Sequence, residues 1–325
     1  NVQPRPTPDA IKTAETTLRN MRLWDPEILR RHEDAKALRN YFAFYDIDVD
    51  RYVINGVQRM VMVGARDLNL SVLDPSQQNW QNLHLLYTHG EGVVVVPVNE
   101  VDEQGAPRYF LKDIPPTGEP ELAIDEPRLY YADTLNENNL PMDRYAIVRT
   151  RLPEFDYGAG EHAEYRWQGE GGMKVYPYFR RLLLAMFFQH TDILLSRDIL
   201  PESRLLFRRN VRIRAEALFP YLLWDPDPYI AIVNRRLVWI LDGYSHTNAI
   251  PYAQLAQTGR TLLNYMKNSV KLTIDAYTGE WQAYLVEPED PIIKTYQRIY
   301  PGLLKPLNEA PQELRNHFRY PELLF

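Results

Sequence analysis

Three aspartates alternate with apolar residues in one stretch of the chain: Asp46, Asp48 and Asp50. On an extended strand, side chains two positions apart lie on the same face, so these three carboxylates would point to one side. Calcium prefers oxygen ligands of this kind, which makes the triplet a candidate metal site and calcium the only candidate cofactor. The simpler interpretation is a solvated strand edge whose charges discourage pairing with another strand.

The calcium-loop pattern around this triplet is incomplete. A helix-loop-helix calcium site that starts at Asp46 would require glycine where Arg51 stands and glutamate where Val57 stands. A second acidic pair, Asp225 and Asp227, lies in the stretch Trp-Asp-Pro-Asp-Pro-Tyr. We expect this pair to shape a proline turn rather than to bind a ligand.

Arginines form the second candidate site. Arg180 and Arg181 precede the apolar run 182–188, and a further group extends from Arg204 to Arg214, where we predict a single helix. Arginine beside exposed apolar surface suits the interface of a membrane. In the alternative interpretation, the apolar run is core and the arginines pair with surplus carboxylates. The candidate residues for contact with an anion or a membrane surface are Arg180, Arg181, Arg204, Arg208, Arg209 and Arg212.

Signatures of established enzyme classes are missing from the sequence. The seven histidines are scattered, and the chain contains neither Gly-x-Ser-x-Gly nor a phosphate-binding glycine loop. The absence of cysteine excludes disulfides, thiolate zinc sites and cysteine nucleophiles in this chain. His89 and Glu91 resemble part of a deaminase site that needs cysteine ligands, and Asp242, Ser245 and His246 fit a polar loop better than a triad. We predict no catalytic residue and expect a protein without enzymatic activity.

Composition places the chain among ordinary globular proteins. It has 325 residues, of which 45% are hydrophobic, and a formal net charge of -6. The acidic balance argues against a nucleic-acid partner. No apolar run approaches the roughly 18 to 20 residues of a membrane helix. The chain begins with Asn1 rather than methionine, so we expect a fragment or a processed protein.

Several hairpins organise the predicted fold. The segments 229–233 and 237–241 are apolar on both faces, which is typical of strands covered on both sides of a sheet. Segments 270–275 and 281–286 predict a second hairpin, and Asn55-Gly56 predicts a type I′ turn between two further strands. Tyr178–Phe188 predicts a strongly apolar helix. We therefore expect an α+β fold with mixed, mainly antiparallel sheets and hairpins, covered by helices.

Short stretches throughout the chain carry a family resemblance. They include Arg22-Leu23-Trp24-Asp25, Tyr87-Thr88-His89-Gly90, Pro201-Glu202-Ser203-Arg204, Asn268-Ser269-Val270-Lys271 and Lys305-Pro306-Leu307. Together, and in this order, they resemble the uncharacterised protein family 0182 of bacterial multi-pass membrane proteins. The resemblance covers nearly the whole chain.

The resemblance implies a cell-membrane protein in which a bundle of membrane helices precedes a large soluble extracytoplasmic domain. Residues 1–8 would then be a linker from the membrane region, and residues 9–325 the α+β domain, with a break between two subdomains near 158–176. Its partners would be its own N-terminal transmembrane region and an envelope protein or an anionic lipid surface. The family has no established activity, so we expect interaction, sensing or envelope assembly. The alternative is an enzyme or a transporter accessory that acts on envelope lipid or glycan.

Overall fold

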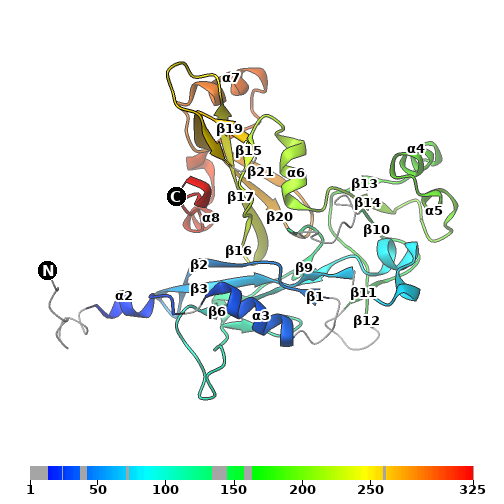
Figure 1. Ribbon diagram of the computed structural model, residues 1–325. Helices are drawn as coiled ribbons and strands as arrows, with labels where there is room; N and C mark the ends of the chain where they lie inside the picture. Colours follow the sequence, from blue (N-terminus) through cyan, green and yellow to red (C-terminus); the bar gives the residue numbers. More distant parts are fainter. Residues whose placement is uncertain are drawn as a thin grey trace.

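The computed structural model describes residues 14–23, 25–36, 42–70, 73–133, 145–156, 163–258 and 261–324. Two large sheets and a smaller helical lobe make up the molecule (Figure 1). The fold is α+β with mainly antiparallel sheets, as the hairpin patterns predict. Residues 1–8, the expected linker, lie outside the described residues, and the expected break near 158–176 stays a prediction.

The first sheet has the strand order β2-β3-β6-β7-β8. Asn55 and Gly56 both have positive φ and join its first two strands in the predicted tight turn. Helix α3 (Pro26–Lys36) packs on one face, where Leu29 contacts Met62 and Val96. The strands are β2 (Ile47–Ile54), β3 (Val57–Ala65), β6 (Val93–Pro97), β7 (Leu111–Lys112) and β8 (Thr117–Gly118).

The second sheet has the order β15-β17-β20-β21-β22, and β16 also pairs with β17. Both predicted central hairpins are confirmed as antiparallel strand pairs. Asn234 and Arg235 both have positive φ in the turn of the first hairpin. The strands are β15 (Leu223–Trp224), β16 (Tyr229–Val233), β17 (Arg236–Thr247), β20 (Tyr265–Asp275), β21 (Trp281–Leu285) and β22 (Lys305–Pro306).

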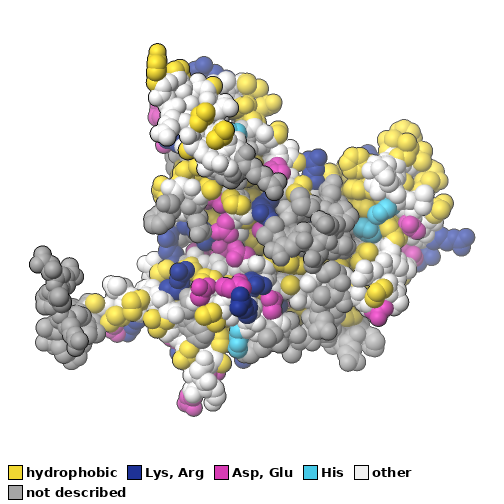
Figure 2. Space-filling view, viewed as in Figure 1, with side chains coloured by type: hydrophobic (Ala, Val, Ile, Leu, Met, Phe, Trp, Pro, Cys, Tyr) yellow, Lys and Arg dark blue, Asp and Glu magenta, His cyan; other side chains and the backbone are white. Residues whose placement is uncertain are grey.

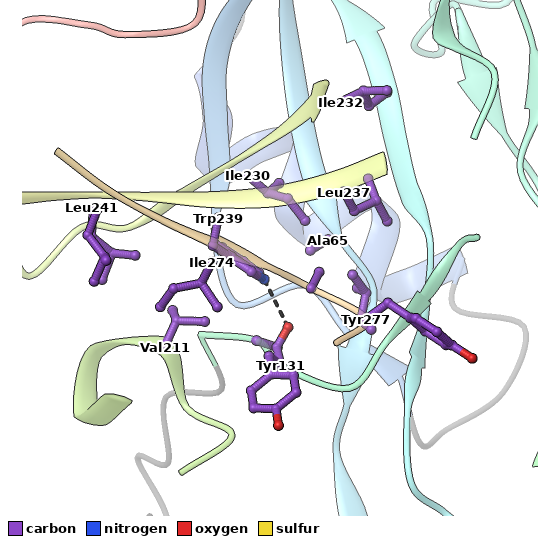
Figure 3. Close-up of a cluster of buried hydrophobic side chains, with 14 of the residues drawn as sticks. Ala65, Tyr131, Val211, Ile230, Ile232, Leu237, Trp239, Leu241, Ile274 and Tyr277 are labelled. Atoms are coloured by element: carbon purple, nitrogen blue, oxygen red, sulfur yellow. Dashed lines mark hydrogen bonds between the residues drawn. The ribbon is translucent and has the colours of Figure 1, made fainter. Parts of the chain in front are cut away.

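One hydrophobic core joins the two large sheets. It contains Val63 and Val95 from the first sheet, and Ile230, Trp239 and other buried residues from the second. Figure 3 shows Trp239 among these side chains, with its indole nitrogen donating a hydrogen bond to the Tyr131 carbonyl at 2.9 Å. Both sheets bury side chains in the same core, so they are packed against each other. We call this region the junction of the two sheets.

The helical lobe has its own smaller core, which includes Tyr145, Leu184 and Ile193. It is built on the sheet β10-β14-β13 and on helices α4 (Tyr178–Phe188) and α5 (Thr191–Leu195). Helix α4 has the predicted bounds. The strands of this sheet are β10 (Ala146–Val148), β13 (Met173–Lys174) and β14 (Arg204–Leu206).

Short elements connect these parts. The remaining α-helices are α2 (Glu15–Arg19), α6 (Val211–Leu218), α7 (Pro291–Ile299) and α8 (Gln312–Asn316). The remaining strands are β1 (Phe42–Ala43), β4 (Asp67–Leu68), β5 (Gly90–Glu91), β9 (Arg128–Leu129), β11 (Glu154–Asp156), β12 (Ala163–Tyr165), β18 (Ala256–Thr258) and β19 (Thr261–Leu263). Short helical turns are η2 (Pro75–Gln77), η3 (Asn82–Leu86), η4 (Pro120–Leu122), η5 (Leu307–Glu309) and η6 (Glu322–Leu324). In the described part of the chain, no helix has the length and apolar character needed to cross a bilayer.

Candidate functional site

Acidic side chains gather at the junction between the two large sheets. Carboxylate oxygens of Asp46, Asp48 and Asp227 all lie within 4.8 Å of one another. Asp46 directly precedes β2 and Asp48 lies on it, whereas Asp227 comes from the proline-rich loop before β16. The predicted triplet is therefore brought together in part, with Asp227 in the place expected for Asp50.

Asp46 and Asp48 line a small cavity of about 20 Å³, which admits about one water molecule, and Asp227 lies beside them. Asp67 and Asp133 also line it, so that five aspartates gather at this point of the junction. The apolar wall comes from Ile230 and Trp239 of the second sheet. We call this group of residues 46, 48, 67, 133 and 227 the acidic pocket.

Arg319 of the C-terminal segment neutralises part of this charge. Its Nη2 lies 2.6 Å from Asp48 Oδ1 and 3.4 Å from Asp227 Oδ2. The guanidinium also stacks over the Tyr229 ring, 3.9 Å from its centroid. Two residues earlier in the segment, His317 Nδ1 lies 2.7 Å from Asp50 Oδ2. Alternate residues of β2 thus pair with alternate residues of the C-terminal segment.

Burial dominates the electrostatics of the pocket. It raises the pKa of Asp48 to about 7, against the opposing effect of Arg319. Burial first, and then repulsion from Asp48, raises the pKa of Asp227 to about 9. Burial also raises the pKa of Asp133 to about 6, although Arg212 Nε lies 2.8 Å away. The Asp227 carboxyl group therefore favours its protonated form at neutral pH, and its oxygens lie within 4.8 Å of those of Asp46.

This arrangement can hold protons and cations. A divalent ion could use oxygens of Asp46, Asp48 and Asp227 but would have to displace a proton and compete with Arg319. Calcium takes six to eight oxygen ligands, and these three carboxylates supply only part of that number. The carboxylate oxygens suit a bound cation, but the Arg319 guanidinium already supplies a positive charge at this place.

The arginine group does not lie on one helix, contrary to the prediction. Arg204 is in β14, Arg208 and Arg209 are in the following loop, and only Arg212 and Arg214 are in α6. Arg208 has φ +51, which interrupts helical geometry. The clustering of arginines in the sequence did not predict a single helix correctly, because the stretch contains a buried strand and a residue with left-handed backbone geometry.

Most of these arginines bond within the protein. Arg209 donates to the carbonyls of Tyr130 and Thr88, and Arg204 donates to the carbonyl of Gly171. Arg181 is buried and donates to the carbonyls of Ile193 and Ser196, whereas Arg212 pairs with Asp133. The ring of Phe207 lies near the Arg208 guanidinium. Arg180 alone in this candidate set is exposed among described residues, and it donates to the carbonyls of Lys174 and Tyr176.

Helix α4 exposes a stripe of large apolar side chains. Phe179, Leu183, Met186 and Phe187 are 68%, 48%, 67% and 67% exposed. They occupy positions i, i+4, i+7 and i+8, which form one face of a helix. The opposite face holds Leu184 and other residues buried in the core of the lobe. Figure 2 shows the resulting hydrophobic patch over this lobe. We call the exposed residues 179, 183, 186 and 187 the α4 stripe.

Two of the other polar groups considered from the sequence have internal partners, whereas Glu91 Oε2 is buried without a hydrogen-bond partner among the described residues. Asp242 pairs with Lys271, and Ser245 donates to Asp290. Glu91 lies in the interior, where burial raises its pKa to about 8. No triad forms among the described residues 242, 245 and 246, but the predicted polar loop is wrong: all three lie in strand β17, where Asp242 and Ser245 are buried.

Sequence reasoning missed two members of the acidic pocket, Asp67 and Asp133, and its cation, Arg319, and it assigned Asp227 only to a turn. Asp67, Asp133 and Arg319 are isolated in the sequence and carry no spacing signal. Asp225 fulfils the expected turn role, because its Oδ1 accepts a hydrogen bond from the Asp227 amide at 3.1 Å. That turn points Asp227 into the pocket. Only the structure shows the matching alternation in which Asp48 pairs with Arg319 and Asp50 with His317.

Known proteins similar to this chain share one family. The model of "Uncharacterised protein family (UPF0182)" matches residues 1–325. A UPF0182 protein of Pelotomaculum thermopropionicum is 41% identical over 321 residues, which are 98% of this chain and 34% of the relative. A UPF0182 protein of Synechococcus sp. is 39% identical over 326 residues, covering 98% of this chain and 37% of the relative.

The same relationship extends to Methanospirillum hungatei, whose UPF0182 protein is 38% identical over 321 residues, 97% of this chain and 35% of the relative. This chain thus spans about a third of the length of the curated relatives that it matches. No solved structure matches it. The full-length match to the family model and the shared identity show that the chain belongs to the uncharacterised protein family UPF0182.

Proposed function

We propose that this chain is the extracytoplasmic interaction domain of a longer membrane protein and that the α4 stripe contacts the lipid bilayer surface. The observation that carries the proposal is the exposure of Phe179, Leu183, Met186 and Phe187 on one helical face. Soluble monomers seldom leave contiguous apolar patches of this kind without a partner. The relatives' greater length supports a parent protein with further parts.

The chemistry around the stripe favours lipid as the partner. Helix α4 contains no acidic residue, and exposed basic residues flank it at Lys174, Arg180 and Arg197. Aromatic and aliphatic side chains beside cationic ones are typical of helices that lie in the headgroup region of a bilayer. Leu195 of α5 extends the apolar surface and is 73% exposed.

A second apolar projection supports the same orientation. Tyr252, Leu255 and Leu262 are exposed around the β18–β19 hairpin at the far end of the second sheet. In Figure 1 this end and helix α4 both extend away from the first sheet toward the same side. Two such projections would give a flat surface two points of contact.

Vesicle cosedimentation tests the proposal. We expect the protein to bind anionic vesicles, and a part of this binding to persist at high salt because apolar side chains insert. The double variant Phe179→Ser/Phe187→Ser should lose the salt-resistant part. The matched control Arg180→Gln should lose only the salt-sensitive part, because it leaves the stripe intact. Absence of binding at any salt concentration would refute lipid as the partner and favour a protein.

The extracytoplasmic location has a separate test. Because this chain has no cysteine, a single cysteine at exposed Tyr252 provides a unique label within the domain. In a full-length relative freed of other cysteines, a membrane-impermeant maleimide applied to intact cells should label that position. Labelling that requires cell lysis would contradict the proposed side of the membrane.

The alternative role in processing envelope lipid or glycan has less support. The acidic pocket is too small for a sugar at about 20 Å³, and no histidine is among its described lining residues. An acid-base site for such substrates would need accessible carboxylates in an open cleft.

A further inference from the structure

Two described arginines are buried, and their hydrogen bonding differs. Arg181 donates to two backbone carbonyls, those of Ile193 and Ser196. Arg66 is similarly enclosed at 8% exposure, yet among the described residues its guanidinium makes a single long hydrogen bond, from Nη1 to the Glu91 carbonyl at 3.3 Å. No carboxylate among the described residues lies within 4 Å of it. A buried guanidinium without an ion pair is costly.

Arg66 lines a pocket of about 460 Å³ on the α3 face of the first sheet. Strand alternation explains this position, because Val63 and Ala65 of β3 point into the core between the sheets, so that Arg66, the next residue, points to the α3 face. A pocket of this volume suits a small molecule. The apolar walls are formed by Phe42, Phe44, Val94, Pro107, Tyr109 and Ile114.

The acidic residues of the pocket have other partners. Glu33 accepts a hydrogen bond from the Tyr109 hydroxyl, and Asp113 accepts one from Thr117 Oγ1 at 3.2 Å. Asp102 accepts two from backbone amides of its own turn. The Phe44 ring lies beside Arg66, with its centroid 5.8 Å from Cζ. Among the described residues, the Arg66 guanidinium thus uses only one of its five donors.

We propose that this pocket binds a carboxylate carried on an apolar body and that Arg66 holds the carboxylate. The fork of guanidinium donors matches the two oxygens of a carboxylate. The aromatic and aliphatic walls would bury the hydrocarbon part. Glu33, Asp102 and Asp113 lie around the same pocket and would repel a phosphate dianion more strongly than a single negative charge. Exposed Lys112 at the rim would attract the ligand.

Calorimetric titration with decanoate and 3-phenylpropionate, both below any micelle concentration, tests this site. We expect saturable binding. In a series of straight-chain acids up to octanoate, the affinity should rise by up to about fourfold for each added methylene. Arg66→Gln should weaken binding by about tenfold or more, because a charged hydrogen-bonded pair is lost. Decanol and inorganic phosphate should bind far more weakly, since decanol lacks the carboxylate and phosphate lacks the apolar body.

Control variants separate this pocket from other surfaces. Phe179→Ser/Phe187→Ser removes the α4 stripe and should leave carboxylate binding unchanged, and Lys112→Gln should weaken it less than Arg66→Gln does. If Arg66→Gln does not fold, Arg66→Lys keeps the charge without the fork and should still bind more weakly than the wild type. Absence of saturable binding to the wild type, or equal binding by decanol, would overturn the proposal. So would loss of binding in the α4 variant alone.

Discussion

The junction of the two sheets and the helical lobe differ in whether their unusual side chains have partners within the protein. At the junction, charged groups from distant parts of the chain find partners within it, as in the ion pair of Asp48 with Arg319. On the lobe, the α4 stripe has no cover from the described residues and faces outward. Unusual residues with internal partners indicate a structural role, whereas exposed apolar residues indicate contact with something else. Substitutions should therefore affect stability at the junction and binding at the lobe.

The largest effect is expected for Trp239→Ala at the junction. The indole is buried in the shared core and bonds the Tyr131 carbonyl, so its removal leaves a cavity and an unsatisfied acceptor. We expect the free energy of unfolding to fall by about 3–5 kcal/mol. Denaturant unfolding measures this loss, and Leu195→Ala on the lobe provides an exposed control. A loss below about 1 kcal/mol would show that the junction tolerates repacking.

Arg319→Ala should have the next largest effect. It leaves Asp48 buried without its cation and removes the guanidinium from the Tyr229 ring. Breaking a fully buried pair costs about 3–5 kcal/mol, and we expect about 2–3 kcal/mol here because Arg319 is partly exposed and Asp48 can take up a proton. Arg180→Ala is the control, with an expected change within about 0.5 kcal/mol. Equal effects for the two variants would contradict the contrast between the regions.

The pH dependence of stability should reveal the acidic pocket. The folded-state pKa of Asp227 is about 9, against about 3.9 in an unfolded chain. Between these values the folded protein holds a proton that the unfolded chain has lost, so this group makes stability fall as pH rises. Asp227→Asn removes that dependence. The thermal midpoint of the variant, relative to wild type, should be higher at pH 8 than at pH 5.

Asp125→Asn serves as the pH control, because Asp125 forms an exposed ion pair with Arg235. Its difference from wild type should change little between pH 5 and pH 8. A parallel pH profile for wild type and Asp227→Asn would show that Asp227 ionises normally in the folded protein.

The lobe should give small stability effects. Phe179→Ser and Phe187→Ser replace exposed side chains, so we expect each free energy of unfolding to stay within about 0.5 kcal/mol of wild type. The same variants should lose salt-resistant vesicle binding. A large loss of stability would mean that the stripe packs within the chain.

Calcium should have the smallest effect. Arg319 already pairs with Asp48, and Asp227 holds a proton near neutral pH, so little uncompensated negative charge is left for the ion. We expect no measurable difference between thermal midpoints with calcium and with chelator. A clear rise with calcium that disappears in Asp48→Asn would instead show that the pocket binds the ion and displaces Arg319.

Local patterns predicted much of the fold. The two-sided apolarity of 229–233 and 237–241, and the Asn55-Gly56 turn, correspond to the observed strand pairs. The bounds of α4 also follow from its apolar run. Patterns failed where a short strand and a single residue with positive φ interrupt the chain, as between Arg204 and Arg212. Such interruptions depend on contacts with distant segments.

The central hairpins, helix α4 and the family were predictable from the sequence, because they depend on local periodicity and on similarity along the whole chain. The meeting of Asp227 and Arg319 with Asp48 depends on the folded chain, since residues far apart in sequence carry no mutual spacing signal. The tertiary structure also decided which face of α4 is exposed. That helix is apolar on both sides, and packing of the lobe covers only the face with Leu184.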